Sequence, residues 1–392
     1  MRNILFLGLV SFFADVSTEM VYPVLPLYLT AAFGASPALL GLIEGIAESI
    51  ASILRVFSGY VTDRWGKKKP VAFAGYAAGF VYKAALLLAS SWTGILAARI
   101  IDRLGKGVRT APRDVMVSES ADQNALGKAF GIHKALDMAG SAVGILISFL
   151  IIDLARKSVS YKFLFAISSI PALMGLAMFF FVKEKKVQRV IKPRERFWEN
   201  AKKLPYELKL YLFVAFLFTL GNSSNAFLLL RAKSTGFDDA TVILLYLLFN
   251  TVAAVLSIPL SRLSDKVGRK RLLVCGYAVF SIVYLGFAFA SGKGVIIGAF
   301  ALYGAYTAMI AGVERAFIAE ISPPEYKGTM LGMHATLIGI ALLPASIFAG
   351  VLWDAVGAFA PFVFGAVMSL IAAVLLQIFM KPGRPARTPV PG

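Results

Sequence analysis

The chain has 392 residues, of which 58% are hydrophobic and only 16% are charged, and its formal net charge at pH 7 is +18. Soluble domains carry about 25% charged residues, so this composition predicts a membrane protein. The same hydropathy argues against a nucleic-acid partner, although the charge is strongly positive. The single cysteine, Cys275, excludes an intrachain disulfide and argues against a zinc site, and we expect neither a metal nor a cofactor.

Twelve apolar stretches follow one another along the chain, each about 20 residues long, which is the length that crosses ~30 Å of hydrocarbon. They lie at residues 3–31, 37–61, 70–90, 92–112, 126–152, 161–182, 209–231, 239–261, 271–290, 294–318, 327–352 and 357–380. The first stretch is long, carries Asp15 and Glu19 and leads directly into the second, so we do not expect a cleaved signal peptide. The predicted fold class is an all-α membrane protein with twelve transmembrane helices.

The second half of the chain repeats the first. The run that begins at Gly59 returns 202 residues later, so that Asp63 matches Asp265, Arg64 matches Lys266 and Gly66 matches Gly268. A repeat of this length predicts two pseudo-symmetric six-helix bundles. We assign residues 1–182 to the N-terminal bundle, 183–208 to a basic cytoplasmic linker, 209–380 to the C-terminal bundle and 381–392 to a disordered tail.

Basic residues predict the orientation of the spans. Lys67, Lys68 and Lys69, the linker and the tail all fall on the side of the N-terminus, whereas the opposite loops hold few basic residues. By the positive-inside rule this side is cytoplasmic. We therefore expect a multi-pass protein of the plasma (inner) membrane that is a monomer in the lipid bilayer, with both termini in the cytoplasm.

The motif Gly59-x-x-x-Asp63-Arg64-x-Gly66 resembles the signature loop between helices 2 and 3 of the major facilitator superfamily, whose twelve spans in two halves match nearly the whole chain. Two further runs, Pro23-Val24-Leu25-Pro26 and Arg103-x-x-Lys106-Gly107-x-Arg109-x-Ala111, are similar to motifs of its drug/proton antiporter branch. The helix 5 motif of that branch expects Gly-Pro followed by Gly-Gly, where this chain has Gly140-Ser-Ala-Val-Gly144. The resemblance implies transport by alternating access, with helices 1 and 4 lining a central cavity.

Ionisable residues within the spans are concentrated in the first half. Such residues are costly in a membrane and usually face a cavity or one another. At 100° per residue the charges between Arg99 and Arg113 fall within about 120° of one helix face, and Glu44 and Glu48 lie one turn apart on another helix. Counting ~1.5 Å per residue places a set of charged residues at one depth near mid-membrane, where they can form one cluster. This set is Asp15, Glu48, Arg103 and Asp137.

The candidate site residues fall into three groups. For proton coupling they are Asp15, Glu19, Glu48, Arg103 and Asp137. For substrate binding they are Tyr22, Glu44, Arg99, Lys106, Asn222, Asn225, Tyr303 and Tyr306. For gating they are Gly59, Asp63, Arg64, Gly66, Asp265, Lys266, Gly268, Glu119 and Glu320. In the gating group the acids Asp63 and Asp265 latch helix N-termini, while Arg64 pairs with Glu119 or Asp114 and Lys266 with Glu320.

Four residues or runs carry further expectations. Lys83 lies near the outer end of its span, where its ammonium group can snorkel to the headgroups. His133 and His334 occupy equivalent points of the two halves, which favours a shared structural role. The polar run 222–225 follows Gly221 and predicts a point where the seventh span unwinds.

Three transport functions remain open. The first is a proton-coupled exporter, an antiporter of an amphipathic organic compound or drug. The second is a proton-coupled importer of an organic anion, with Arg99, Arg103 and Lys106 as its clamp. The third is an uncoupled facilitator or lipid translocator. The chain has no Gly-rich phosphate loop followed by Lys-Ser/Thr and no nucleophile beside a histidine base, so we predict no enzyme activity.

Overall fold

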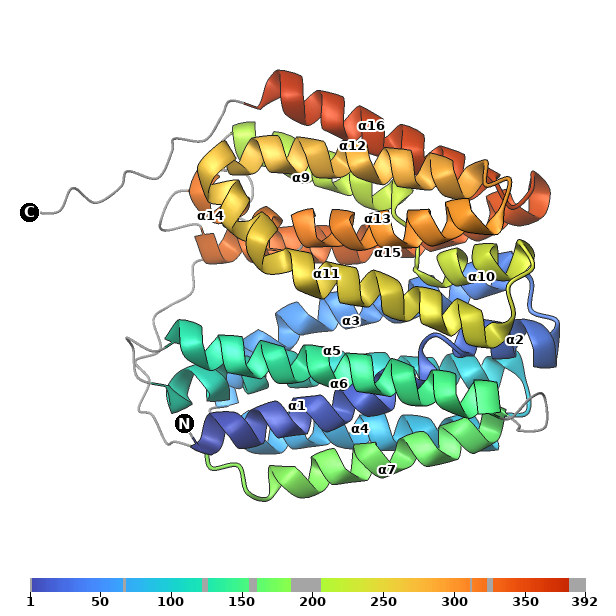
Figure 1. Cartoon of the computed structure of the whole chain (residues 1–392). Helices are drawn as coiled ribbons and strands as arrows, with labels where there is room; N and C mark the ends of the chain where they lie inside the picture. The colour runs from blue at the N-terminus through green and yellow to red at the C-terminus, as the bar shows by residue number, and fades with distance from the viewer. Residues whose placement is uncertain are drawn as a thin grey trace, which may run out of the picture. The chain divides into compact units, whose positions relative to one another are not determined.

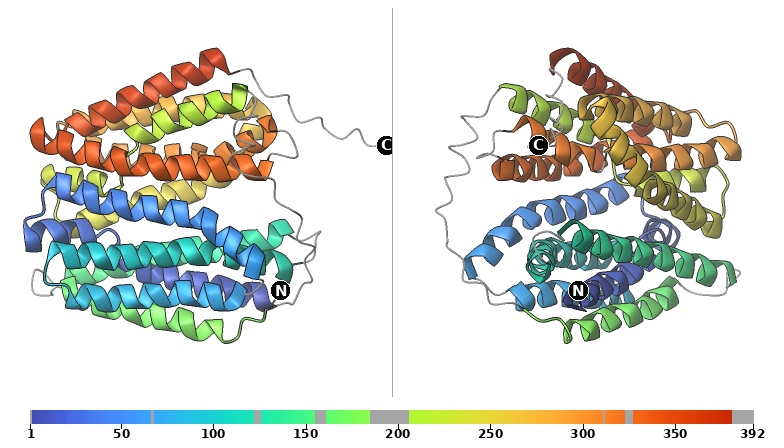
Figure 2. Two further views of the ribbon diagram at one scale, coloured as in Figure 1. Left: turned by 180° about the vertical axis from the view of Figure 1, so that it is seen from behind. Right: turned by 60° about the vertical axis from the view of Figure 1, so that its left-hand side comes forward.

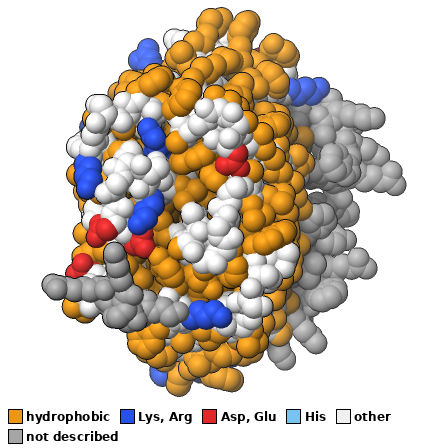
Figure 3. All heavy atoms as spheres, turned by 90° about the vertical axis from the view of Figure 1, so that its right-hand side faces the viewer, with side chains coloured by type: hydrophobic (Ala, Val, Ile, Leu, Met, Phe, Trp, Pro, Cys, Tyr) orange, Lys and Arg blue, Asp and Glu red, His pale blue; other side chains and the backbone are white. Residues whose placement is uncertain are grey.

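The protein is all-helical in the computed structural model, which describes residues 2–65, 68–121, 126–154, 161–184, 206–310, 312–322 and 327–380. Eleven helical segments of these residues are long and apolar enough to cross a membrane. The remaining span of the twelve is helix α5 (Trp92–Ser120), which is long enough to cross a membrane but carries many charged side chains and is therefore less apolar than the others. Figure 3 looks along the long helices at the ends that lie opposite the N-terminus, and hydrophobic side chains make up much of this face, with few charged ones among them.

Packing divides the chain into two units, one of Met1–Lys192 with Ser224–Leu247 and one of Pro193–Ser223 with Leu248–Gly392. The long helices of the first unit are α1 (Arg2–Val21), α3 (Pro37–Trp65), α4 (Lys68–Leu88), α5, α6 (Leu126–Leu154) and α7 (Tyr161–Phe179). Helix α1 packs against α6 and α7, and α5 packs against α3 and α4 (Figure 1). The short helix α10 (Ala226–Ser234) also belongs to this unit and contacts α2 (Leu25–Phe33) and α3.

The second unit contains the other spans. They are α9 (Tyr206–Gly221), most of α11 (Asp239–Val267), α12 (Arg269–Ala288), α13 (Lys293–Ile310), α14 (Val313–Ile321), α15 (Lys327–Ala355) and α16 (Ala360–Phe379). Helix α12 packs against α13 and α16, and α9 packs against α15 and α16, as the rear view of Figure 2 lets the reader follow. A side chain on Gly221 would meet Gly365 of α16, so these two glycines allow close helix packing.

Three of the predicted spans are broken. The first divides into α1 and α2 around Pro23 and Pro26, which lack the N–H groups that a continuous helix needs. The seventh unwinds after Gly221 and resumes at Ala226, so the break predicted from the polar run 222–225 is confirmed. The tenth divides into α13 and α14 near Gly312, a break that the hydropathy did not indicate.

Gly268 separates α11 from α12 with φ of 94°, a left-handed backbone that side chains other than glycine rarely adopt. The conformation explains why the repeated motif carries glycine here. Its counterpart Gly66 lies outside the described residues.

Candidate ion-coupling site

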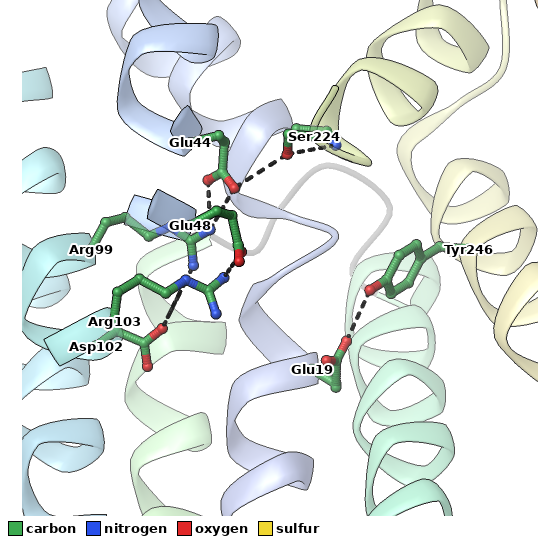
Figure 4. Close-up of polar contacts among 9 residues, drawn as sticks. Glu19, Glu44, Glu48, Arg99, Asp102, Arg103, Ser224 and Tyr246 are labelled. Atoms are coloured by element: carbon green, nitrogen blue, oxygen red, sulfur yellow. Dashed lines mark hydrogen bonds and ion pairs between the residues drawn. The ribbon is translucent and has the colours of Figure 1, made fainter. Parts of the chain in front are cut away.

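Two stacked ion pairs join α3 to α5 in the first unit. Arg99 Nη2 donates to both carboxylate oxygens of Glu44 at 2.6 Å, and Arg103 Nη2 lies 2.8 Å from Glu48 Oε1 (Figure 4). Glu44 and Glu48 are four residues apart, as are Arg99 and Arg103, so the second pair repeats the first one turn further along both helices. The Ser91 side chain, which accepts from the Gly94 N–H at 3.2 Å, caps the N-terminus of α5 and so helps fix the helix that presents both arginines.

Asp102 completes this network from within α5. One of its oxygens lies 3.7 Å from Arg99 Nη1 and 3.8 Å from Arg103 Nε. Arg99, Arg103 and Asp102 are 1%, 1% and 4% exposed, so the charges are almost entirely removed from solvent. An isolated charge buried to this extent would carry a large desolvation free energy, which a closely placed opposite charge can offset. The carboxylates therefore neutralise both arginines.

The aromatic ring of Tyr22 covers the arginine side of the network. It lies at the break between α1 and α2, with its centroid 5.5 Å from Arg99 Cζ and 5.9 Å from Arg103 Cζ. Guanidinium groups at this distance from an aromatic face are attracted by its quadrupole. Tyr22 thus contributes to holding the arginines, in addition to any contact with a substrate.

Two hydroxyl groups that the sequence analysis did not select reach acids of the first half. Ser224 Oγ donates to Glu44 Oε2 at 3.4 Å, and the Tyr246 hydroxyl donates to Glu19 Oε2 at 3.3 Å (Figure 4). Both belong to the stretch Ser224–Leu247, which packs with the first unit. The nearby polar run 222–225 signalled the region of Ser224, but nothing in the sequence indicated Tyr246.

A separate carboxyl pair joins α1 to α6. The side chains of Asp15 and Asp137 form a hydrogen bond. Two carboxylates can make this contact only if one of them carries a proton, since an ionised carboxylate has no donor. Lys134 Nζ lies 2.9 Å from Asp137 Oδ2, and Lys106 on α5 acts electrostatically on Asp15. A proton shared by the two carboxyl groups accounts for this contact, and the cations Lys134 and Lys106 can stabilise its loss.

The four residues predicted at one depth form two contacts. Glu48 lies against Arg103, and Asp15 against Asp137. Lys106 of α5 interacts electrostatically with Glu48, Asp15 and Glu19. The four residues therefore lie in two separate contacts, and Lys106 acts on an acid of each.

The second unit presents hydroxyl, amide and aromatic groups. Asn222 Nδ2 donates to the Tyr306 hydroxyl at 3.3 Å, and the rings of Tyr303 and Tyr306 are 5.4 Å apart. A partly buried acid that is not among the candidate site residues also lies in this unit: the Tyr277 hydroxyl donates to Glu314 Oε1 at 3.2 Å. Asn225, by contrast, belongs to the first unit, where it directly precedes α10.

Comparison with known proteins decides the family. The model of the Major Facilitator Superfamily matches residues 7–230 and 211–392, which together cover nearly the whole chain. The chain belongs to the Major Facilitator Superfamily. It is a secondary transporter of a small molecule, a multi-pass integral membrane protein and not an enzyme.

Relatives of this superfamily member include an uncharacterized MFS-type transporter of Methanocaldococcus jannaschii, MJ1317, which is 38% identical over 381 residues, 96% of this chain and 94% of the relative. The multidrug resistance protein MdtH of Photorhabdus laumondii is 22% identical over 341 residues, 85% of this chain and 82% of the relative. The crystal structure of the nucleoside transporter NupG, a point mutant, superimposes with a TM-score of 0.82 at 13% identity, covering 97% of this chain and 100% of NupG. The superimposition confirms the predicted twelve-helix superfamily fold.

The gating motif of the superfamily is only partly described. The structure does not describe the side chains of Asp63 and Arg64 or the surroundings of Gly59. All of Gly66 lies outside the described residues. Glu119 is a predicted partner of Arg64, but its Oε2 lies 2.7 Å from Nζ of Lys68, whose side chain is 4% exposed. The Asp63 latch therefore stays a prediction.

The equivalent motif of the second half has an arginine at its centre. Arg269 lies 2.9 Å from Glu320 and 3.1 Å from Asp265. We expected Lys266 to bind Glu320. Arg269 takes this position because it lies in the first turn of α12, and its planar group offers a separate nitrogen to each carboxylate.

The expectation that Lys83 snorkels to the headgroups was wrong. The residue is 1% exposed, and its ammonium group lies 4.1 Å from the centroid of the Tyr82 ring. Hydropathy gave its depth but not the face of α4 on which it lies, and that face is turned towards the charges of α5. Asp102 and Arg99 both act on it electrostatically.

Proposed function

We propose that this transporter is a proton-coupled exporter that exchanges protons for an amphipathic organic compound by alternating access. The observation that carries the proposal is the carboxyl contact of Asp15 on α1 with Asp137 on α6, and one shared proton would satisfy this contact. A carboxyl group at such a depth is a functional candidate, because an ionisable residue within a span is otherwise only a cost. The similarity to MdtH, a multidrug resistance protein, supports a drug-like compound.

Loading and release follow from the cations around this pair. When the pair is closed to water, burial favours the shared proton. When Lys106 or Lys134 approaches, or water enters, the doubly ionised pair becomes less costly and the proton leaves. The movement of the two halves past each other can change both conditions, so that one proton enters on one side of the membrane and leaves on the other. Glu19 and Glu48, each near Lys106, are second sites at which the same exchange can occur.

The paired arginines disfavour import of an organic anion. A substrate carboxylate clamped by Arg99 and Arg103 would have to displace Glu44 and Glu48, which lie at 2.6 and 2.8 Å. Displacing a carboxylate from a buried pair leaves it unpaired and costs several kcal/mol. Uncharged groups of Asn222, Tyr303 and Tyr306 suit the apolar and hydrogen-bonding parts of an amphipathic molecule.

We further propose that the repeated loops control gating. Asp63 and Asp265 would stabilise helix N-termini on the side that we assign to the cytoplasm by the positive-inside rule, together with both chain termini.

Proteoliposome transport tests the proposal. The purified protein is reconstituted with a pH dye inside, and ethidium, an organic sulfonate and lysophosphatidylcholine are added in turn. The expected result is exchange of ethidium for protons: an ethidium gradient drives protons in the opposite direction, and a proton gradient drives ethidium in the opposite direction. Proton movement with the sulfonate alone would establish anion transport instead, and movement of any compound without protons would establish a facilitator or lipid translocator.

A further inference from the structure

The two histidines of the chain occupy equivalent positions in the halves but have different surroundings. His133 is 5% exposed and its Nε2 lies 3.0 Å from Ser11 Oγ, which in turn lies 3.0 Å from the Tyr76 hydroxyl. His334 is 6% exposed, its ring stacks on an aromatic ring 6.0 Å away, and its Nε2 has no hydrogen-bond partner among the residues that the structure describes. A packing role accounts for His334. It does not account for a polar chain of three residues around His133.

The contact between Ser11 and His133 joins the same two helices, α1 and α6, as the Asp15–Asp137 pair, and it lies one helical turn away from that pair. Ser11 precedes Asp15 by four residues on α1, and His133 precedes Asp137 by four residues on α6. The step between the two levels is ~6 Å along the helix axes, a distance that one water molecule can bridge. The His133 level lies nearer the end of the unit at which α1 begins.

Close packing fixes this alignment of α1 and α6. A side chain at Gly140 would overlap the carbonyl oxygen of Phe12, and one at Gly144 would overlap that of Val16. The backbones therefore touch directly, so the helices cannot slide past each other without a clash. The Ser11–His133 and Asp15–Asp137 contacts therefore keep a fixed position relative to each other.

Charged and titratable groups from each neighbouring helix face His133. Arg113 and Asp114 of α5 and Lys134 and Asp137 of α6 act on it electrostatically. Helix α4 contributes Tyr76, whose ring lies 4.5 Å below the Arg109 guanidinium. The Asp114 side chain is 45% exposed, so a carboxylate open to solvent lies on an adjacent helix. The imidazole thus interacts electrostatically with Asp137 of the carboxyl pair and with Asp114, a carboxylate that is open to solvent.

We propose that His133 is the proton relay between the Asp15–Asp137 pair and the end of the first unit at which α1 begins. The proton enters at one ring nitrogen as the proton on the other nitrogen leaves, and a change of tautomer then restores the starting state without net charge transfer to the ring. Ser11 and Tyr76 are positioning residues that hold the ring in place. The inference rests on the proposed proton coupling and adds the route by which the proton reaches the pair.

Removal of the imidazole tests the relay. The variants are His133→Ala and, as a matched control in the other half, His334→Ala. Each is reconstituted as the full chain, and both ethidium-driven proton movement and ethidium–ethidium exchange at equal pH are measured. We expect His133→Ala to slow proton movement about a hundredfold, the scale of a lost proton-transfer group, with exchange preserved. Imidazole added to the buffer restores the proton movement, whereas His334→Ala changes neither rate.

Other outcomes separate this inference from the proposed function. Wild-type proton movement in His133→Ala overturns the relay and leaves proton coupling intact. Proton movement and exchange that fall together, without restoration by imidazole, show a structural histidine and also overturn it. A wild-type protein that exchanges ethidium without moving protons, or that does not transport ethidium at all, overturns the proposed function and with it the relay.

Discussion

The two units of the protein share a helical repeat but differ in how they carry charge. In the first, a nearly continuous network of ion pairs joins Glu44, Arg99, Asp102, Arg103 and Glu48, and all of these except the partly exposed Glu48 are buried. In the described part of the second, the partly buried acid Glu314 accepts a hydrogen bond from the hydroxyl of Tyr277. Similar helix packing in the two units therefore does not imply similar charge chemistry.

The comparison also separates fixed charges from exchangeable ones. Charges in closed pairs, such as Arg99 with Glu44, lose much if either partner leaves. Acids held by a proton or a hydroxyl, such as Asp15 and Glu314, can change their charge or their partner at lower cost. We therefore expect stability to depend on the first class and transport on the second.

The largest expected effect is on the stability of the first unit. Arg99→Met leaves Glu44 buried without its cation, which should destabilise the protein by about 3–5 kcal/mol. The double variant Glu44→Gln with Arg99→Met removes both charges and should recover most of this loss. Thermal unfolding of the purified protein in detergent measures both. Equal losses in the single and double variants would show that the pair has no energetic coupling.

The next effect is on coupling. Asp15→Asn retains size and hydrogen bonding but cannot release a proton, so uphill transport should disappear while exchange of compound persists. Asp153→Asn, an exposed acid on α6, is the control and should keep both activities. Uphill transport in Asp15→Asn at the wild-type rate would remove Asp15 from the mechanism.

A third variant examines the arginine of the second ion pair. Arg103→Lys keeps the charge but loses the planar group that contacts Glu48 and faces Tyr22. The loss of about one charge-assisted hydrogen bond, ~1.5 kcal/mol, corresponds to roughly a tenfold lower transport rate. Rates near wild type in Arg103→Lys together with loss in Arg103→Ala would identify a simple point charge.

The acid of the second unit allows a test of substrate charge. Glu314 accepts a hydrogen bond from the Tyr277 hydroxyl and interacts electrostatically with the adjacent Arg315, and a cationic substrate group is a suitable further partner for it. Glu314→Gln should lower the transport of ethidium severalfold, the effect of about 1 kcal/mol, and leave a neutral aromatic analogue unaffected. Equal losses for both compounds would assign Glu314 to packing.

The last prediction concerns the equivalence of the two motif loops. Gly268→Ala places a side chain at φ of 94° and should destabilise the protein by about 1–2 kcal/mol. Gly292→Ala, at a loop position with open space around it, is the control and should be nearly neutral. If the halves are equivalent at this loop, Gly66→Ala should cost as much as Gly268→Ala in the same unfolding measurement.

The sequence by itself determined the architecture. Span length and hydropathy gave the membrane helices, the repeat gave the internal symmetry, and the loop motif gave the superfamily. The charged face of α5 also followed from the sequence, because the helical period alone decides which residues share a face. The helix break after Gly221 was visible for a similar local reason, since polar side chains compete with the backbone for hydrogen bonds.

Only the tertiary structure decided the partners of those charges. Periodicity fixes the face of a helix but neither its rotation towards a neighbour nor its axial register, and these depend on close contacts such as that of Gly140 with Phe12. The pairing of Glu44 with Arg99, the burial of Lys83 and the contact between Asp15 and Asp137 all depend on both quantities. The different surroundings of His133 and His334 arise in the same way: an identical place in the repeat meets Ser11 in one half and an aromatic ring in the other.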